Sequence, residues 1–587
     1  MRKLTISLLC PVIGICSVIA QNKSISGVVT SSEDGQPVIG ASVVVMGTTI
    51  GTVTDIDGKF VLDVPQNGKR LMISYVGMNT QQVPIKENVI VKLTSNVQDL
   101  DEVVVTAQGL TRKEKSLGYS TQQVKADELM QVRQTDLNNA LVGKVSGVRF
   151  LGSSGSTFDS GKIVLRGTTS ITQAGGNEPI YVIDGVIAEN ANSINMDDVE
   201  SVNVLKGPAA TALYGSRGGN GAVVITSKGG SKGVSHSEIN VSHTLSFDKY
   251  YNHYDMQQKY GGGYSGADAE LPIFHYDASK HPSYLAAMDG KAYYDYGNDA
   301  SWGAVLDGRE YAPWYAWDPT DPRFGQTTTW SPKLDLADLF RTGVNNTTNI
   351  SFSKSGKDYS SRISFSNVSR QGLTPNSEAA RRYLTVRTDF KPIDRLKVSM
   401  DYKYTYRKNH NAAAEGYQEL GNALYSYQQW GHVNVDLKDL KENYQRPDGS
   451  YKSWNIVSPT NLSAQFHENP FVLFDKINRD KVNQYHVFSG DAELTILDNL
   501  KAGIRVNGNI QNQKEEETVP LHIFGTTASY WQEQRMSSDI QTQGRVTWGD
   551  RFINDRLSVD AAVFFEDRVY ERDIVKAFTR DGLILDD

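Results

Sequence analysis

The side chains that could perform catalysis or hold a metal ion do not complete a known motif. Residues 155–163, GSTFDSGKI, resemble a phosphate-binding loop, but five residues separate the glycines where four are needed, and Ile163 stands where Ser or Thr would bind magnesium. Residues 55–58, DIDG, lack the third acid and the distal Glu of a calcium loop, so we interpret them as a turn. No two of the 10 histidines stand three or four residues apart, as a helical zinc pair would require. We therefore expect no enzyme activity, no cofactor and no metal site.

Composition and charge narrow the class of protein further. The 587 residues are 39% apolar and 22% charged, which is typical of an ordered chain of several domains. The net charge of −7 argues against a nucleic-acid partner. Tyrosine is the most abundant aromatic residue, with 29 Tyr against 19 Phe.

The first twenty residues predict export. Arg2 and Lys3 precede an apolar run over residues 4–19, and VIA at 18–20 fits a cleavage site, so we expect a signal peptide over residues 1–20. A membrane anchor is the alternative, but the run is shorter than the ~20 residues of a span. A lipoprotein is a second alternative, although Ile15 before Cys16 is large for a lipobox. Both cysteines lie in this segment, so the mature chain offers no thiol for a disulfide.

A short apolar strand lies in an expected linker over residues 99–110. Within DLDEVVVTAQG, residues 99–109, a β-branched run follows three acids, and this composition is typical of a strand. An unpaired strand edge invites aggregation, and the acids Asp99, Asp101 and Glu102 keep such a strand soluble. Two interpretations stay open: it is the last strand of the preceding domain, or it is kept for pairing with another protein.

Two folded units flank this strand. Residues 21–97 contain six or seven short β-rich runs separated by turn pairs such as Asp57-Gly58, which predicts a small β-sandwich. Residues 111–230 are mixed. Leu137, Ala140, Leu141 and Val145 are apolar at helical spacing, with Gly147 as the expected stop. Pro208 and Gly215 bracket a second expected helix. Strand-like runs at 161–167, 179–185, 199–207 and 220–228 complete the prediction of an α/β domain.

From residue 235 onward the hydrophobic pattern has a period of two. In LKVSMDYKYTYRK, residues 396–408, apolar and aromatic residues alternate with charged and polar ones. One face of such a strand tolerates lipid and the other tolerates water. We find nine runs of this kind, near 238–246, 346–354, 359–368, 382–390, 396–407, 484–496, 501–512, 538–549 and 556–567.

The connections between these runs alternate strictly between long and short. The first spans about 100 residues and the second about 4, as in an outer-membrane barrel with long external loops and short periplasmic turns. A water-facing β-sandwich has no reason to sort its loops in this way. Nine strands in an open sheet would leave two edges in lipid, which is unfavourable. We therefore expect residues 235–587 to form part of a barrel, and the 587 residues to be a fragment of a longer gene product.

Several segments resemble a known family. LRGTTS at 165–170, PIYVIDG at 179–185 and VESVNVLKGPAATALYGSRGGNGAVVITSKGG at 199–230 resemble the plug domain of TonB-dependent outer-membrane transporters. Residues 24–64 resemble the carboxypeptidase-regulatory-like sandwich that precedes the plug in the SusC/RagA family. ASWGAVLDGRE at 300–310 is similar to a segment of that family's barrel. The family is far longer and ends in an aromatic strand, whereas this chain ends GLILDD.

The resemblance implies roles for individual residues. DEVVVTA resembles a TonB box, in which a strand adds to TonB by a few main-chain hydrogen bonds of about 1 kcal/mol each. The implied TonB-binding residues are Asp101, Glu102, Val103, Val104, Val105, Thr106 and Ala107. The implied plug-motif residues are Arg166, Gly167, Tyr181, Asp184, Gly185, Lys206, Gly207, Pro208, Tyr214, Gly215 and Arg217.

The longest expected external loop is rich in aromatic residues. Because Tyr and Trp stack on sugars and anchor protein partners, Trp302, Trp314, Tyr315 and Trp317 are candidate contacts for a substrate or a partner. The alternative is a folded loop that uses its aromatic side chains as its own core.

The implied fold class is mainly β: a sandwich, an α/β plug and about nine strands of an antiparallel outer-membrane barrel, which in the family has roughly 22 strands. The implied function is TonB-driven import of a large nutrient, a glycan or oligosaccharide, across the outer membrane of a Gram-negative bacterium. The implied partners are the TonB-ExbB-ExbD complex, a SusD-like surface lipoprotein, the cargo and outer-membrane lipid. A peptide cargo is one alternative, and a non-transporting surface receptor or adhesin on the same barrel is another.

Overall fold

The structure is a computed structural model that describes residues 23–32, 35–46, 48, 50–65, 68–75, 78–94, 103–105, 111–113, 121–130, 136–151, 158, 161–168, 170, 176–188, 190–207, 212–230, 235–251, 255–266, 268–414, 422–442, 444–552, 557–579 and 582. Its contacts divide the chain into two compact units, an N-terminal one that runs to Val103 and a second that contains most of the remaining residues. The expected signal peptide lies outside the described residues.

The N-terminal unit is a β-sandwich. Its strands are β1 (Lys23–Ser31), β2 (Ser42–Val45), β3 (Gly51–Val53), β4 (Lys59–Val64), β5 (Arg70–Ser74), β6 (Gln81–Pro84) and β7 (Asn88–Leu93). One sheet has the order β4-β1-β7 and the other β3-β2-β5-β6. Every second residue of β4 and β7 is buried, as expected for strands with one face on a core. Val29, Val43 and Leu71 are fully buried in that core.

The expected linker contains a short strand pair. β8 (Val103–Val105) and β9 (Thr111–Lys113) form a two-stranded sheet. An isolated pair of this size is marginally stable in water, and among the described residues no third strand joins β8 and β9.

The described residues between 121 and 230 form the expected α/β unit, which we call the plug. Its elements are β10 (Thr121–Lys125), α1 (Ala126–Met130), α2 (Leu137–Leu141), β11 (Val148–Leu151), β12 (Lys162–Leu165), β13 (Ile180–Ile183), β14 (Val186–Ala188), η4 (Ala191–Ser193), η5 (Met196–Asp198), β15 (Val199–Leu205), η6 (Ala212–Asn220) and β16 (Ala222–Ser227). The main sheet has the order β10-β15-β16-β13-β14. Valines and isoleucines on both of its faces are buried, which explains the nearly continuous apolar runs in the sequence.

Both expected helices of the plug differ from the sequence pattern. α2 ends at Leu141 and does not reach Val145, because Val142 is extended with ψ of 131° and Gly143 then turns the chain with φ of 75°. Gly215, expected just beyond a helix, lies inside η6 with φ of 63° and ψ of −153° and interrupts it. Both glycines therefore act where the chain needs a positive φ.

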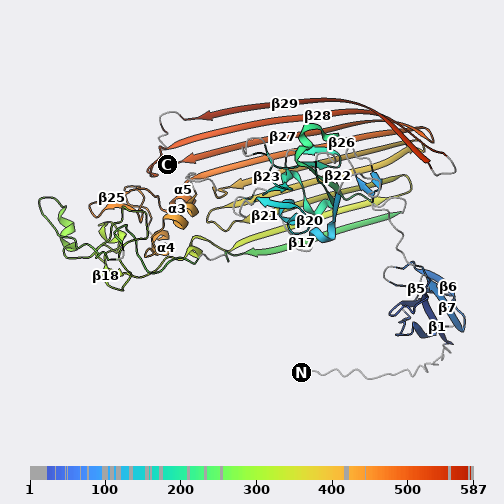
Figure 1. Ribbon diagram of the computed structural model, residues 1–587, viewed down its shortest axis with the longest axis horizontal. Helices are drawn as coiled ribbons and strands as arrows, with labels where there is room; N and C mark the ends of the chain where they lie inside the picture. Colours follow the sequence, from blue (N-terminus) through green and yellow to red (C-terminus); the bar gives the residue numbers. More distant parts are fainter. Residues whose placement is uncertain are drawn as a thin grey trace, which may run out of the picture. The chain divides into compact units, whose positions relative to one another are not determined.

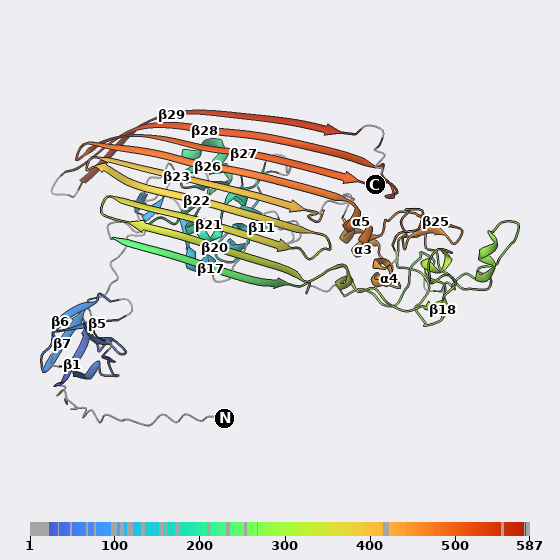
Figure 2. The same cartoon turned by 180° about the vertical axis from the view of Figure 1, so that it is seen from behind.

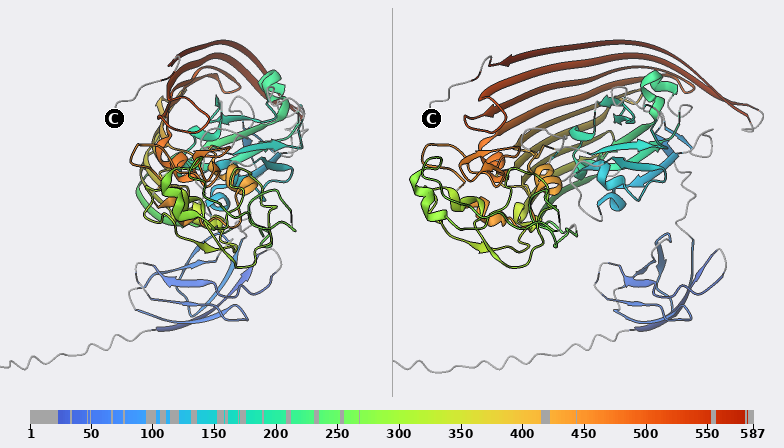
Figure 3. Two further views of the ribbon diagram at one scale, coloured as in Figure 1. Left: turned by 90° about the vertical axis from the view of Figure 1, so that its left-hand side faces the viewer. Right: turned by 60° about the vertical axis from the view of Figure 1, so that its left-hand side comes forward.

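The nine expected strands form one antiparallel sheet. They are β17 (His236–Asp248), β20 (Gly343–Ser355), β21 (Tyr359–Gln371), β22 (Glu378–Ile393), β23 (Leu396–His410), β26 (Asn478–Leu497), β27 (Leu500–Val519), β28 (Ser529–Phe552) and β29 (Leu557–Phe578). Each strand pairs with the next of this series, and Figures 1 and 2 show them side by side in that order. The sheet curves around the plug (Figure 3). The expectation of a mainly β chain with a sandwich, a plug and about nine antiparallel strands is confirmed.

The burial of side chains in this sheet is the reverse of that in a water-soluble sheet. On β17, Ile239, Val241 and Phe247 are each at least 65% exposed. On β21, Ser364 and Ser366 are almost completely buried on the face toward the plug. A large apolar surface on the outside and polar groups on the inside are unfavourable in water and favourable in lipid. Within the described residues, no helix has both the length and the apolar character needed to cross a membrane.

Two long connections of the sheet and a short one fold together into one domain, which we call the loop domain: the described residues within 249–342, 411–477 and 520–528. Its elements are η7 (Ser283–Met288), β18 (Glu310–Tyr311), η8 (Trp314–Trp317), β19 (Thr328–Thr329), η9 (Leu336–Leu339), α3 (Ala423–Trp430), α4 (Leu437–Lys441), β24 (Ile456–Ser458), β25 (Asn461–Ala464) and α5 (Pro470–Lys476). Trp317, Trp330, Tyr427 and Trp454 belong to one shared core. The domain lies at one end of the sheet (Figures 1 and 2).

Candidate functional site

A buried ion cluster at the β13–β14 turn fixes the plug to the nine-stranded sheet, which we call the wall. Ile183 pairs with Val186, which leaves Asp184 and Gly185 as a two-residue hairpin loop with φ of 48° and 90°. Asp-Gly is favoured in such turns because both positions need a positive φ. The Asp184 carboxylate accepts hydrogen bonds from Lys403 Nζ at 2.7 Å and Arg387 Nη1 at 3.1 Å.

The charges of this cluster compensate one another out of contact with water. Only 9% of the Asp184 side chain and 10% of the Lys403 side chain are exposed. Burial alone would raise the pKa of Asp184, but Lys403 and Arg387 hold that pKa well below its usual value. Asp401 also pairs with Lys403. Removing one partner of a buried pair of this kind costs about 3–5 kcal/mol.

A second anchor lies at the end of η5. Asp198 pairs with Arg362 Nη1 of β21 at 2.6 Å and accepts a hydrogen bond from Thr385 Oγ1 of β22 at 2.9 Å. Asn195, three residues earlier, donates to Ser366 Oγ of β21 at 3.0 Å. The adjacent acids 197 and 198, which look like a solvated pair in the sequence, therefore differ: Asp198 is 3% exposed and bound to the wall.

A third anchor uses a backbone carbonyl. The Phe158 oxygen accepts hydrogen bonds from Arg407 Nη2 of β23 at 2.8 Å and from Arg381 of β22. Phe158 has φ of 58° and a buried ring. All three anchors therefore join the plug to β21, β22 and β23.

Other plug-motif residues shape the plug itself. Tyr181 donates its hydroxyl hydrogen to Asn138 Oδ1 at 3.0 Å inside the core, and Lys206 Nζ donates to Gln122 Oε1 at 3.1 Å. Arg166, Gly167 and Gly207 have positive φ. Pro208 lies outside the described residues.

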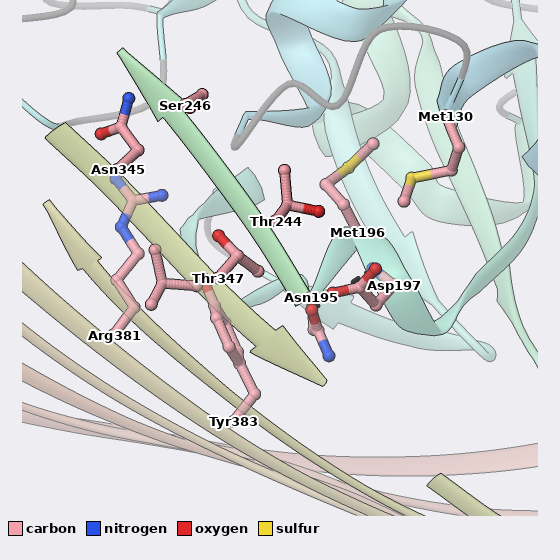
Figure 4. A pocket seen from close by; sticks show the side chains of 11 residues that line it. Met130, Asn195, Met196, Asp197, Thr244, Ser246, Asn345, Thr347, Arg381 and Tyr383 are labelled. Carbon is pink, nitrogen blue, oxygen red and sulfur yellow. Dashed lines mark hydrogen bonds between the residues drawn. The ribbon is translucent and has the colours of Figure 1, made fainter. Parts of the chain in front are cut away.

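The plug also contacts the last two strands of the sheet, β28 and β29. Near β28, Arg217 comes within 3.9 Å of Asp539, which already pairs with Arg568. A cavity of about 270 Å³ separates this part of the plug from β28 and β29, and its lining includes Tyr214, Arg217 and Glu566. A smaller cavity of about 50 Å³ lies between the plug and β17 and β20 (Figure 4). Met130 and Met196 line its plug side, and Thr244, Thr347 and Tyr383 line its wall side.

The predicted TonB-binding segment is described only in part. Val103–Val105 form β8 and pair with β9, whereas Asp101, Glu102, Thr106 and Ala107 lie outside the described residues. The strand conformation of the three valines agrees with their β-branched composition, and their role in TonB binding stays a prediction.

The four aromatic candidates of the long loop separate into two groups. Trp314, Tyr315 and Trp317 are at most 8% exposed and belong to the core of the loop domain. Their positions fit the alternative interpretation, in which the aromatic side chains form the loop's own core. Trp302 is 54% exposed and stays available for contact.

A buried histidine organises the core of the loop domain. His432 Nε2 lies 2.7 Å from the Asn298 carbonyl oxygen, so this nitrogen carries the proton. His432 Nδ1 then accepts the hydroxyl hydrogen of Tyr294 at 3.0 Å. Burial lowers the pKa of His432 to about 3, so the ring is neutral at physiological pH.

Sequence reasoning missed the wall residues that hold the plug. Arg362, Arg387, Lys403 and Arg407 stood in the predicted runs only as members of a polar face. The sequence signal that could have identified them is a long cationic side chain at an inward position of a strand. Such a side chain is rarely buried unless it has a partner. Their individual partners depend on contacts between residues about 160 to 250 positions apart.

Comparisons with known proteins agree with this architecture. Residues 25–105 match the CarboxypepD_reg-like domain family, and residues 113–222 match the TonB-dependent Receptor Plug Domain family. The TonB-dependent receptor SusC of Bacteroides thetaiotaomicron is 28% identical over 87% of this chain and 47% of its own length. The TonB-dependent receptor P39 of Formosa agariphila is 37% identical over 37% of this chain and 20% of its own length.

Solved structures show the same fold. The RagAB peptide importer in its 'open-open' state gives a TM-score of 0.57 at 17% identity, covering 82% of this chain and 51% of that chain. A second structure of the RagAB peptide transporter gives 0.55 at 18% identity, covering 80% and 50%. This chain therefore spans about half the length of the relatives that it matches over most of its residues.

Proposed function

We propose that this chain, a TonB-dependent receptor of the SusC and RagA kind, works in the energy-coupled import of a large nutrient across the outer membrane. The wall of nine strands would cross the membrane, the plug would close the lumen, and residues 101–107 would be the handle that TonB pulls. The observation that carries this proposal is the reversed burial of the sheet, with apolar residues outside and an ion-bonded plug inside. An adhesin requires only an exposed loop. It requires neither a plug that closes the lumen nor a segment that TonB binds.

The location and partners follow from the same proposal. Residues 1–20 would direct export and be removed. The TonB-ExbB-ExbD complex would supply force from the inner membrane. A SusD-like surface lipoprotein would deliver cargo at the loop domain, and lipid would cover the outer face of the sheet. No covalent chemistry is part of this function, because the cargo only changes compartment.

A glycan or oligosaccharide is the cargo that we favour. The face of the sheet toward the plug carries Ser, Thr and Asn side chains, and a path opened by movement of the plug would expose these groups to hydrogen-bond a hydroxylated solute. A peptide is the second candidate, because the solved transporter of similar fold is named as a peptide importer. The two cargo classes need different growth substrates and can be separated by experiment.

Uptake by cells carrying the full-length gene product tests the proposal. Cells that grow on a neutral polysaccharide only when both this gene and tonB are intact would support glycan import. The same double dependence on a peptide mixture would assign the alternative cargo. Substrate binding at the cell surface that is independent of tonB, with no uptake of either class, would contradict transport and favour a receptor or adhesin.

A further inference from the structure

The two carboxylates that anchor the plug to the wall differ in what their partners would keep after a separation. Asp184 at the β13–β14 turn binds Lys403 and Arg387, and Asp198 at the end of η5 binds Arg362. Both carboxylates have side chains that are at most 9% exposed. Because a buried charge without a counter-ion is strongly unfavourable, the neighbours of each charge decide which anchor can open.

The wall holds a carboxylate of its own beside the cations that bind Asp184. Asp401 pairs with Lys403, which stands two positions later on the same face of β23. It also lies directly opposite Arg387 of β22 in the strand register. The Asp401 side chain is 10% exposed, and its Oδ2 atom has no hydrogen-bond partner among the described residues. Asp401 can therefore accept a further hydrogen bond from either cation.

A second wall carboxylate stands near Arg387. Asp389 Oδ2 lies 3.9 Å from Arg387 Nε, and Asp389 Oδ1 accepts a hydrogen bond from Ser399 Oγ at 2.6 Å. The wall thus carries one carboxylate for each of the two cations that bind the plug turn. If the turn withdrew, Lys403 could remain with Asp401, and Arg387 with Asp389.

The plug side of the same anchor also keeps hydrogen bonds after a separation. Ser227 of β16 donates to the Asp184 carboxylate through its backbone N at 3.0 Å and its Oγ at 2.6 Å. Both bonds lie within the plug and move with it. Hydrogen bonds to an ionised carboxylate are stronger than those between neutral groups, so Asp184 stays partly satisfied when it leaves the wall.

The Asp198 anchor has no such substitute on the wall. The residues directly opposite Arg362 are Ser353 of β20 and Arg387 of β22. The nearest residues on the same face of β21 are both serines. Withdrawal of Asp198 would therefore leave the Arg362 guanidinium, whose side chain is 7% exposed, beside another cation and without its carboxylate.

We propose that Asp401 is a positioning residue for plug release: it takes over Lys403 when the β13–β14 turn leaves the wall, while the Asp198–Arg362 pair keeps the plug attached at η5. This inference rests on the proposed import function and names the side of the plug that opens. Asp401 also weakens the closed state, because two carboxylates then share one ammonium group and repel each other.

Thiol labelling of the purified full-length protein in detergent tests this role without any cargo. Both cysteines of the chain lie in the expected signal peptide, so Val186→Cys provides a reporter next to the turn, at a position that is 4% exposed. A buried thiol reacts in proportion to the fraction of molecules that are locally open. In this background Asp401→Asn should slow labelling by about tenfold or more, because the open state would leave Lys403 without a carboxylate. Asp184→Asn should accelerate it.

The sign of the effect separates this role from a structural one. An Asp401 that merely stabilised the wall would loosen the plug when removed and would accelerate labelling. Asp401→Glu keeps the charge and should label nearly as fast as the reporter alone. Asp480→Asn is the matched control, because it removes a wall carboxylate whose partners, Lys408 and His410, belong to the wall. A second reporter, Met196→Cys beside Asp198, should label at a rate that Asp401→Asn does not change.

Three results would overturn the inference: labelling at position 186 that Asp401→Asn leaves unchanged or accelerates, equal slowing by Asp480→Asn, or equal slowing at positions 186 and 196. Uptake separates this question from transport. If Asp401→Asn slows labelling but no tonB-dependent uptake of any cargo exists, the release role stands and the import function fails. If uptake depends on tonB and labelling ignores Asp401, the import function stands and the release role fails.

Discussion

Asp184 Oδ2 lies 2.7 Å from Lys403 Nζ, and this contact joins the tip of a plug hairpin to the middle of wall strand β23 across 219 positions of sequence. Both side chains are at most 10% exposed. Arg387 of β22 reaches the same carboxylate, so one plug residue is bound to two neighbouring strands.

Replacing Asp184 by Asn should loosen the plug. The change leaves Lys403 and Arg387 without their shared counter-ion and should destabilise the plug–wall contact by about 3–5 kcal/mol. In the full-length protein we expect higher outer-membrane permeability to a large antibiotic such as vancomycin, and easier proteolysis of the plug. The double variant Asp184→Asn, Lys403→Met should recover part of the loss, because it restores the charge balance of the cluster, with Arg387 left to compensate Asp401. Asp358→Asn, at an exposed turn of the wall, is the control. Wild-type permeability of Asp184→Asn would show that the cluster does not hold the plug.

Proline in β8 should uncouple transport without affecting assembly. Successive N–H groups of a strand point to opposite edges, so one of Val104 and Val105 faces β9 and the other faces the open edge. Proline has no N–H group and cannot add to a sheet there. Val104→Pro or Val105→Pro should abolish tonB-dependent uptake, whereas Val104→Ile should be nearly silent. The readout is substrate-dependent growth with the amount of protein in the outer membrane measured in parallel. Normal transport by both proline variants would remove this segment from TonB binding, and loss of the protein from the membrane would assign it to a folded domain.

The loop domain should be outside the cell and the short turns inside. Epitope tags in the connections 249–342 and 411–477 of the full-length protein should bind antibody on intact cells, because long barrel loops face outward. A tag at the β22–β23 turn, Asp394–Arg395, should react only after the outer membrane is opened. Labelling of intact cells at that turn would reverse the orientation of the sheet.

The stability of the loop domain should fall in mild acid. The pKa of His432 is about 3 in the folded domain against about 6.5 in an unfolded chain. The unfolded state therefore binds more protons between pH 6.5 and 3, and stability decreases as the pH falls through this window, by up to about 1.4 kcal/mol per pH unit. Burial also lowers the pKa of His467 and adds to the slope. His432→Gln should reduce the slope between pH 6.5 and 5, as followed by tryptophan fluorescence during denaturation, and an unchanged slope would contradict this assignment.

The sequence by itself determined the class and the order of the domains. Alternation along residues 396–407 predicts a strand with one apolar face, because side chains of a strand point to opposite sides at every step. The sorted connection lengths predict a meander, and the nine strands β17 to β29 of the main sheet lie in chain order as expected. The turn pair Asp57-Gly58 was recognisable from its residue types, and it lies between strands β3 and β4. These features are local, or repeat at a fixed spacing, and each can be recognised without knowledge of a distant partner.

Only the tertiary structure decided how the side chains are used. Trp302 and Trp317 look equivalent in the sequence, yet one is half exposed and the other completely buried. The difference arises because three connections, far apart in the chain, share one core. Likewise Lys403 is one polar residue of an alternating strand until the plug hairpin places a carboxylate beside it. Burial and ion pairing depend on which distant segments of the chain are in contact, and sequence periodicity does not predict these contacts.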